Sequence, residues 1–107
     1  MDKVIENGEV AVLYSPGFGA GWYTWNYATP ECLFDPDIVE LVRSGAHPDE
    51  IEKTALEKWS QDPDYFYPGG ADALRIEWLR EGSRFRIEEY DGSEDLVTEA
   101  DQEWLTA

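Results

Sequence analysis

The sequence predicts an α+β domain in which an antiparallel sheet of four or five strands carries a two-helix hairpin on one face. Three observations lead to this prediction. The chain starts with a strand-turn-strand pattern, continues with two proline-capped segments of helical periodicity, and returns to strand periodicity in its last third. With 107 residues, it is expected to form a single domain over 1–107.

The N-terminal segment is predicted to form a hairpin. Val4 and Ile5 precede Asn7-Gly8, a pair that suits the positive φ values of a two-residue turn, and a longer strand follows at 9–14. Residues 10–14 form a nearly continuous apolar run, which is typical of a strand buried on both faces. We expect this strand to lie in the centre of its sheet.

Two helices are predicted next. Asp35 supplies an N-cap carboxylate, Pro36 takes the first helical position, and Gly45 ends the first helix. A second helix begins at Pro48, and its apolar residues recur at helical spacing up to residue 59. Acids outnumber lysines in this second helix, so a DNA-reading helix-turn-helix is not expected. The loop at 61–72 carries aromatic rings that must rest on another part of the molecule.

Strand periodicity returns in the last third of the chain. Apolar and charged residues alternate at 74–79 and 84–88 on either side of Gly82, so we expect these two strands to pair as a hairpin. A turn at 91–93 predicts a further strand at 96–98. Trp104-Leu105 is expected to close an edge of the sheet.

The chain is strongly acidic, with a formal net charge of -16. Half of its eight basic residues are arginines between positions 75 and 86, and no basic residue follows. Direct binding to nucleic acid is therefore disfavoured, because that affinity depends on Lys and Arg that neutralise phosphates. The acidic C-terminal end is expected to project a negative field toward a partner.

The sequence predicts a cytoplasmic protein of a host cell. Cys32 is the only cysteine, which excludes an internal disulfide and a cysteine-built metal site. The N-terminus lacks a basic region followed by an apolar run, and no apolar stretch approaches the ~20 residues that span a bilayer. We expect no membrane partner.

The segment 15–26, SPGFGAGWYTWN, is the main candidate site. Glycines allow close approach to the main chain, consecutive N–H groups can hold an anion, and aromatic rings add stacking. Alternation over residues 22–27 favours a strand with Tyr23, Trp25 and Tyr27 on one face and Trp22, Thr24 and Asn26 on the other. The competing interpretation is a wide turn whose rings complete the core. The glycine spacing matches neither the dinucleotide fingerprint nor the P-loop.

The arginines form the second candidate feature. Arg84 and Arg86 are expected to share one strand face near Arg75 or Arg80, where guanidinium groups could neutralise an anionic ligand. The alternative is a solvated face of ion pairs with the nearby acids Glu77, Glu81, Glu88 and Glu89.

Catalysis has little support in the sequence. His47 is the single histidine and stands at a helix start, where a cap or surface role is expected. Beyond His47 there is no second histidine that could activate Cys32 as a nucleophile. Ser15 does not belong to the nucleophile-elbow pattern G-x-S-x-G. The acids at 91–95 match no calcium loop. We expect no catalytic residues, no cofactor and no metal.

Three stretches resemble small uncharacterised proteins encoded by tailed phages and their prophages: EVAVLYSPGFGAGWYTWN, LFDPDIVELV and RFRIEEYDGSE. This resemblance spans most of the chain and implies no assigned activity. Small acidic phage proteins are similar in kind to counter-defence factors that occupy a host nucleic-acid-binding protein or sequester a signalling nucleotide.

Two function classes follow. The first is a non-enzymatic module that sequesters a nucleotide-like small molecule between the 15–27 segment and the loop around 65–67. Its predicted ligand-binding residues are Ser15, Gly17, Phe18, Gly19, Gly21, Trp22, Tyr23, Trp25, Asn26, Tyr65, Arg84 and Arg86.

The second class is an acidic inhibitor that mimics nucleic-acid phosphates and blocks a basic groove on a host protein. Its predicted contact residues are Glu88, Glu89, Asp91, Glu94 and Asp95. Such a mimic would bind with steep salt dependence. A homo-oligomer is compatible with this composition, since five tryptophans in so small a domain leave apolar area for another subunit to cover.

Overall fold

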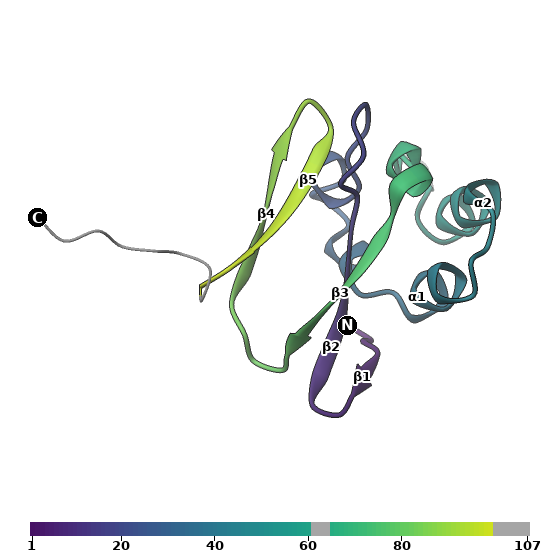
Figure 1. Cartoon of the computed structure of the whole chain (residues 1–107). Coiled ribbons are helices and arrows are strands. Elements are labelled where there is room, and N and C mark those ends of the chain that lie inside the picture. Colours follow the sequence, from purple (N-terminus) through teal and green to yellow (C-terminus); the bar gives the residue numbers. More distant parts are fainter. Residues whose placement is uncertain (61–64, 100–107) are drawn as a thin grey trace, which may run out of the picture.

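The computed structural model describes residues 1–60 and 65–99 (Figure 1). One antiparallel sheet has the order β1-β2-β3, formed by β1 (Ile5–Glu6), β2 (Glu9–Tyr14) and β3 (Arg75–Arg80). A second antiparallel sheet pairs β4 (Phe85–Tyr90) with β5 (Ser93–Thr98). The α+β class is therefore confirmed, whereas the strands form two sheets in place of the single sheet that was predicted.

The N-terminal hairpin forms as the sequence predicts. Asn7 and Gly8 have φ values of 52° and 78°, which a two-residue hairpin turn of this type requires. β2 pairs with β1 on one side and with β3 on the other, so it is the central strand. Residues 10–13 are all buried. Side chains from both faces of β2 therefore contribute to the core.

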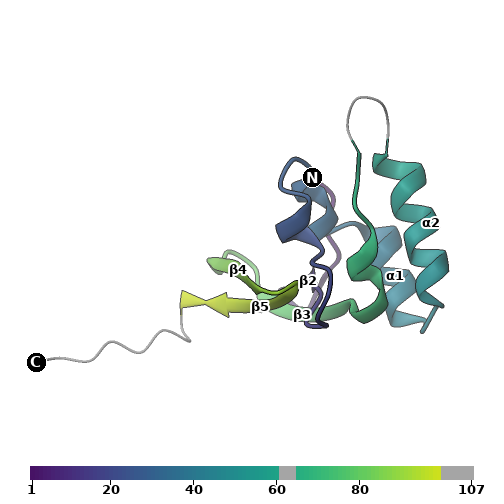
Figure 2. The same ribbon diagram turned by 90° about the horizontal axis from the view of Figure 1, so that it is seen from above.

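Helices α1 (Pro36–Arg43) and α2 (Pro48–Trp59) begin at the predicted prolines. The Asp35 carboxylate caps α1 by accepting a 3.1 Å hydrogen bond from the Ile38 N–H. Gly45, with φ 74°, follows its C-terminal end. His47 Nδ1 accepts a hydrogen bond from the Asp49 N–H and thereby caps α2, which confirms the cap role. Figure 2 shows the two helices side by side, to one side of the strands.

The predicted hairpin between 74–79 and 84–88 is wrong. β3 pairs with β2 along its whole length, from Tyr14 opposite Arg75 to Glu9 opposite Arg80. β4 instead pairs with β5 through the predicted turn, whose Asp91 and Gly92 have φ values of 50° and 83°. Alternation identifies a strand, but it does not say which strand lies beside it. Trp104-Leu105 lies outside the described residues.

The core has two hydrophobic clusters, one on each face of β2. Ala11 and Leu13 belong to the larger cluster, which includes Ile38 and Val39 of α1 together with residues of α2. Val10 and Val12 belong to the smaller cluster, against which Phe85, Ile87 and Leu96 of the β4–β5 hairpin pack. The helices and the hairpin thus cover opposite faces of the central strand.

Candidate functional site

The Gly-aromatic segment is folded around the side chain of Glu94, which belongs to β5 and is completely buried. Glu94 Oε1 accepts a 2.8 Å hydrogen bond from the Ser15 N–H. Glu94 Oε2 accepts 2.8 Å hydrogen bonds from the N–H groups of Trp22 and Thr24, and a 2.6 Å bond from the Thr24 hydroxyl. The amides that were expected to hold a foreign anion therefore hold a carboxylate of the same chain.

Further hydrogen bonds join this segment to the turn between β4 and β5. The Glu94 N–H donates to the Ser15 carbonyl over 2.8 Å, and the Gly19 N–H donates to the Asp91 carbonyl over 3.1 Å. The Ser93 hydroxyl donates to the Pro16 carbonyl over 2.7 Å. The chain turns around the buried carboxylate, and Tyr23–Trp25 form the 3-10 helix η1. The strand alternation expected for 22–27 is therefore absent.

The glycines of this region do permit a close approach, and the neighbours are other residues of the same chain. A Cβ atom on Gly70 would lie 2.5 Å from the Gly21 carbonyl oxygen. A Cβ atom on Gly17 would lie 2.5 Å from the Cβ of Ala73. Both close approaches arise because the 3-10 helix η3 (Gly69–Ala73), which contains Gly70 and Ala73, packs against the Gly-aromatic segment. Glycine is required at these positions to admit η3.

The aromatic rings divide between the core and the surface. Trp22 is fully buried, makes an edge contact with Phe66 at 5.0 Å between ring centroids, and donates from Nε1 to the Cys32 carbonyl over 2.7 Å. Trp22 thus follows the competing interpretation, in which a ring completes the core. Phe18, in contrast, is 76% exposed, and Tyr65 is exposed as well.

Asn26, predicted as a ligand-binding residue, holds the loop at 65–67 against the Gly-aromatic segment. The Tyr67 N–H donates to Asn26 Oδ1 over 2.7 Å, and Asn26 Nδ2 donates to the Tyr67 carbonyl over 2.9 Å. The rings of Trp25 and Tyr67 then lie 4.9 Å apart between centroids, and Tyr23 contacts Tyr27. The side chain of Asn26 is buried and acts as a connector between the two segments.

An open cleft of about 280 Å³ lies between the Gly-aromatic segment and η3. Its lining consists of Ser15, Gly17, Phe18, Gly19, Ala20, Gly69, Asp72 and Ala73. Asp72 is the one acidic or basic residue among the described residues of this lining, so it gives the cleft a negative charge. The contribution of η3 could not be predicted from the sequence, because nothing local to 69–73 indicates that this segment packs beside residues 15–20.

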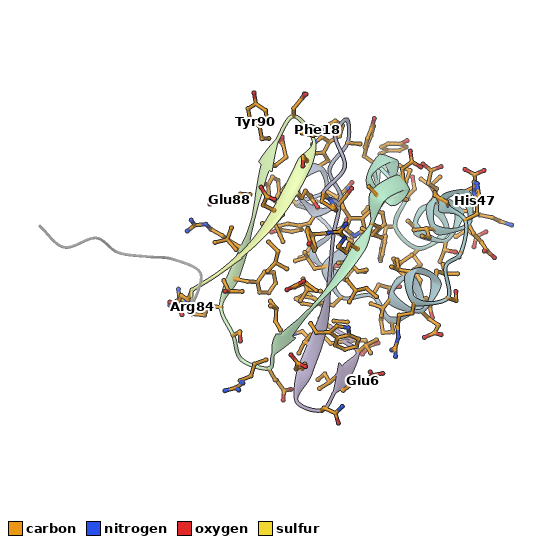
Figure 3. All side chains as sticks on the ribbon, viewed as in Figure 1. Glu6, Phe18, His47, Arg84, Glu88 and Tyr90 are labelled. Carbon is orange, nitrogen blue, oxygen red and sulfur yellow. The ribbon has the colours of Figure 1, made fainter. Side chains whose placement is uncertain are left out.

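The structure places Arg84 and Arg86 away from the Gly-aromatic segment. They line a different cleft of about 300 Å³, together with Phe85, Val97, Thr98 and Glu99. Arg84 pairs with Glu99 at 3.4 Å, and Arg86 pairs with Glu88 at 2.8 Å. Figure 3 shows Arg84 at the opposite end of the hairpin from Phe18 and Tyr90. The predicted ligand-binding residues are thus not brought into one site.

The acids of the second hypothesis also divide into two groups. Glu88, Glu89, Asp91 and Asp95 are exposed, whereas Glu94 is buried and cannot meet a partner. Glu88 stands directly opposite Asp95 in the β4–β5 pairing. Because Ile87 and Leu96 pack on the core, the pair Glu88 and Asp95 lies on the outer face of the hairpin.

Cys32 lies in the core beneath this region. Burial raises the pKa of its thiol far above the usual range, and the charge of Glu94 raises it further. A thiol that stays protonated is a poor nucleophile and a poor metal ligand. Among residues 1–60 and 65–99, no group of three or more His, Cys, Asp or Glu side chains is arranged to hold a metal ion.

No helix within the described ranges combines the length and the apolar character needed to cross a membrane. Comparisons of the chain with protein-family models, with curated proteins and with solved structures find no match.

Proposed function

We propose that this protein binds a basic surface of a partner protein through the outer face and the turn of the β4–β5 hairpin. We call this surface the acidic face and define it by Glu88, Asp91 and Asp95. One observation carries the proposal: Glu88 and Asp95 are both exposed and stand directly opposite each other. Like charges at such positions destabilise a strand pair. Arg86 on the same strand already pairs with Glu88 at 2.8 Å, so cationic groups of a partner would pair with Asp95 and Asp91 and would compete with Arg86 for Glu88.

The hairpin is well anchored for such a role. Its inner side chains Phe85, Ile87 and Leu96 pack against the core, and Glu94 ties β5 to the Gly-aromatic segment by buried hydrogen bonds. A surface that is already ordered loses little conformational entropy when a partner binds. The acidic face is therefore presented in a form suited to recognition.

The net charge of -16 favours the same kind of partner. A strongly negative protein is attracted to a basic groove and repelled by nucleic acid, which increases its association rate with nucleic-acid-binding proteins. The resemblance to phage proteins agrees with this role, in which the protein occupies a host factor in the cytoplasm as a counter-defence inhibitor. Carboxylates of the acidic face would then stand where phosphates of the displaced nucleic acid bind.

A charge-matched pair of variants tests this proposal. The face variant carries Glu88→Gln, Asp91→Asn and Asp95→Asn, and the control variant carries Glu40→Gln, Glu50→Gln and Glu57→Gln. Both remove three negative charges, and all six side chains are exposed. Glu89 is left unchanged because its carboxylate accepts a hydrogen bond from the Gly92 N–H in the turn.

The measurement is capture of host proteins at increasing salt, followed by elution with duplex DNA. We expect wild type and control to retain the same partner, DNA to displace it, and the face variant to lose it. Equal retention by the face variant and the control would contradict the proposal, because the location of the three charges would then be irrelevant.

A small-molecule ligand is the second candidate function, and the cleft of about 280 Å³ beside Phe18 supports it. Asp72 would repel a nucleotide-like anion there, and none of the described residues that line the cleft is Lys or Arg. Native mass spectrometry of protein purified from its host cell would reveal a retained molecule together with the number of subunits. Phe18→Ser is the suitable binding variant, since Trp22→Ala would disrupt the core.

A further inference from the structure

We infer that the cleft between Phe18 and Asp72 receives an arginine side chain from the basic partner. This inference rests on the proposed function and adds the chemistry of recognition. The cleft lies at the same end of the molecule as the turn of the acidic face, because the Gly19 N–H donates a 3.1 Å hydrogen bond to the Asp91 carbonyl. A partner bound to Asp91 therefore lies within reach of the cleft.

Two exposed rings mark this end of the molecule as an interaction surface. Tyr90 is 79% exposed and Phe18 is 76% exposed, the highest values among the large apolar side chains of the described residues. Figure 3 shows both at the same end of the structure. Phe18 lines the cleft, and Tyr90 is the last residue of β4 before the turn. Exposed rings beside a pocket are typical of the anchors that dominate binding energy in protein interfaces.

The charges beside these rings decide the chemistry of the partner. Asp72 is exposed and contributes to the cleft, and Asp91 lies on the adjoining turn. A partner side chain that stacks on the Phe18 ring and also pairs with the Asp72 carboxylate must be a cation with a flat face. Guanidinium meets this requirement, because it stacks on aromatic rings and pairs with carboxylates through two parallel N–H groups. A lysine ammonium group is more strongly hydrated and lacks the planar fork.

The experiment compares two peptides of equal charge, deca-arginine and deca-lysine, by isothermal titration calorimetry at fixed salt. We expect wild type to bind deca-arginine more tightly, with about a two- to fivefold preference for each ring that stacks on a guanidinium. Phe18→Ser and Asp72→Asn should each reduce this preference, whereas Glu57→Gln, an exposed acid on α2, should leave it unchanged.

Equal affinity of wild type for the two peptides would overturn the inference, as would an unchanged preference in both cleft variants. Phe18 is exposed, and Asp72→Asn preserves the side-chain shape, so thermal unfolding should show that both variants fold. The face variant separates the two proposals. If the face variant binds both peptides as tightly as the control variant with three substitutions on α1 and α2, the proposed function fails. If the wild type shows no preference for deca-arginine but the face variant binds both peptides more weakly, only the inference about arginine fails.

Discussion

Ser15 and Glu94 are joined by two hydrogen bonds that run in opposite directions. The Ser15 N–H donates to the Glu94 carboxylate, and the Glu94 N–H donates to the Ser15 carbonyl, both over 2.8 Å. This pair connects the end of β2 to the start of β5, so it joins the two sheets. The same carboxylate also holds Trp22 and Thr24, which makes Glu94 the centre of the Gly-aromatic segment.

Removal of the Glu94 carboxylate should strongly destabilise the fold. Glu94→Ala leaves the buried N–H groups of Ser15 and Trp22 and the half-buried N–H group of Thr24 without their acceptor, and we expect a loss of about 3–5 kcal/mol in unfolding free energy. Glu94→Gln keeps one acceptor oxygen but turns an NH₂ group toward a donor, so we expect a loss of about 1–3 kcal/mol. Urea unfolding followed by tryptophan fluorescence measures both.

The neighbouring acid provides the control. Asp95 is exposed, and its substitution by alanine should change the unfolding free energy by no more than about 0.5 kcal/mol. If Glu94→Ala were as stable as Asp95→Ala, the buried carboxylate would not organise the segment.

The contact between Gly17 and Ala73 predicts a compensating pair of substitutions. A methyl group on Gly17 would meet the Ala73 Cβ at 2.5 Å, so Gly17→Ala should cost about 1–3 kcal/mol of stability. Ala73→Gly removes the clash and should recover part of this loss in the double variant. A double-mutant cycle by chemical denaturation should give a coupling of at least about 0.5 kcal/mol, and strict additivity would argue against close packing of η3.

Cys32 should be unreactive in the folded protein. Its thiol is fully buried and burial raises its pKa, so little thiolate is available to a reagent. We expect Ellman's reagent at pH 8 to modify the native protein only at the rate of global or local unfolding, and to modify the urea-unfolded protein at once. Rapid modification of native protein would place the thiol at the surface.

Lys58 should contribute stability that disappears at alkaline pH. Its pKa is raised above the usual 10.5, first by the hydrogen bond to Asp37, whose carboxylate lies 2.6 Å away, and also by the charge of Asp35. A raised pKa in the folded state means that the contribution is complete below pH 10.5 and is lost as pH rises through the folded pKa.

Urea unfolding of wild type and Lys58→Gln at several pH values tests this. The difference in unfolding free energy should be constant from neutral pH to about pH 9 and should shrink above pH 10.5. A difference that stays constant across the alkaline range would mean that the Lys58 charge contributes nothing.

Local chemistry explains which parts of the fold could be predicted. The Asn7-Gly8 turn, the Asp35 cap and the Asp91-Gly92 turn each depend on residues that lie within a few positions of one another. Strand pairing depends on residues far apart, and the alternation in β3 and β4 fits several neighbours equally well. The predicted pairing of these strands therefore failed although both strands exist.

The candidate site shows the same division. The glycines indicated a close approach to the main chain, but they could not show that η3 and Glu94 of the same chain make it. Glu94 is one of 24 acidic residues, and nothing near it in sequence distinguishes it from the exposed Asp95. The sequence did offer one signal. The Gly-aromatic segment was expected to present N–H groups to an anion, and in a chain with 24 acidic residues that anion could be a carboxylate of the same chain.

Amide hydrogen exchange followed by NMR tests the central role of Glu94 most directly. We expect the N–H groups of Ser15, Trp22 and Thr24 to exchange slowly in the wild-type protein and to lose protection in Glu94→Gln, where the carboxylate is absent. Fast exchange of all three amides in the wild-type protein would contradict this expectation, because the segment would then be open to solvent and free to bind another anion.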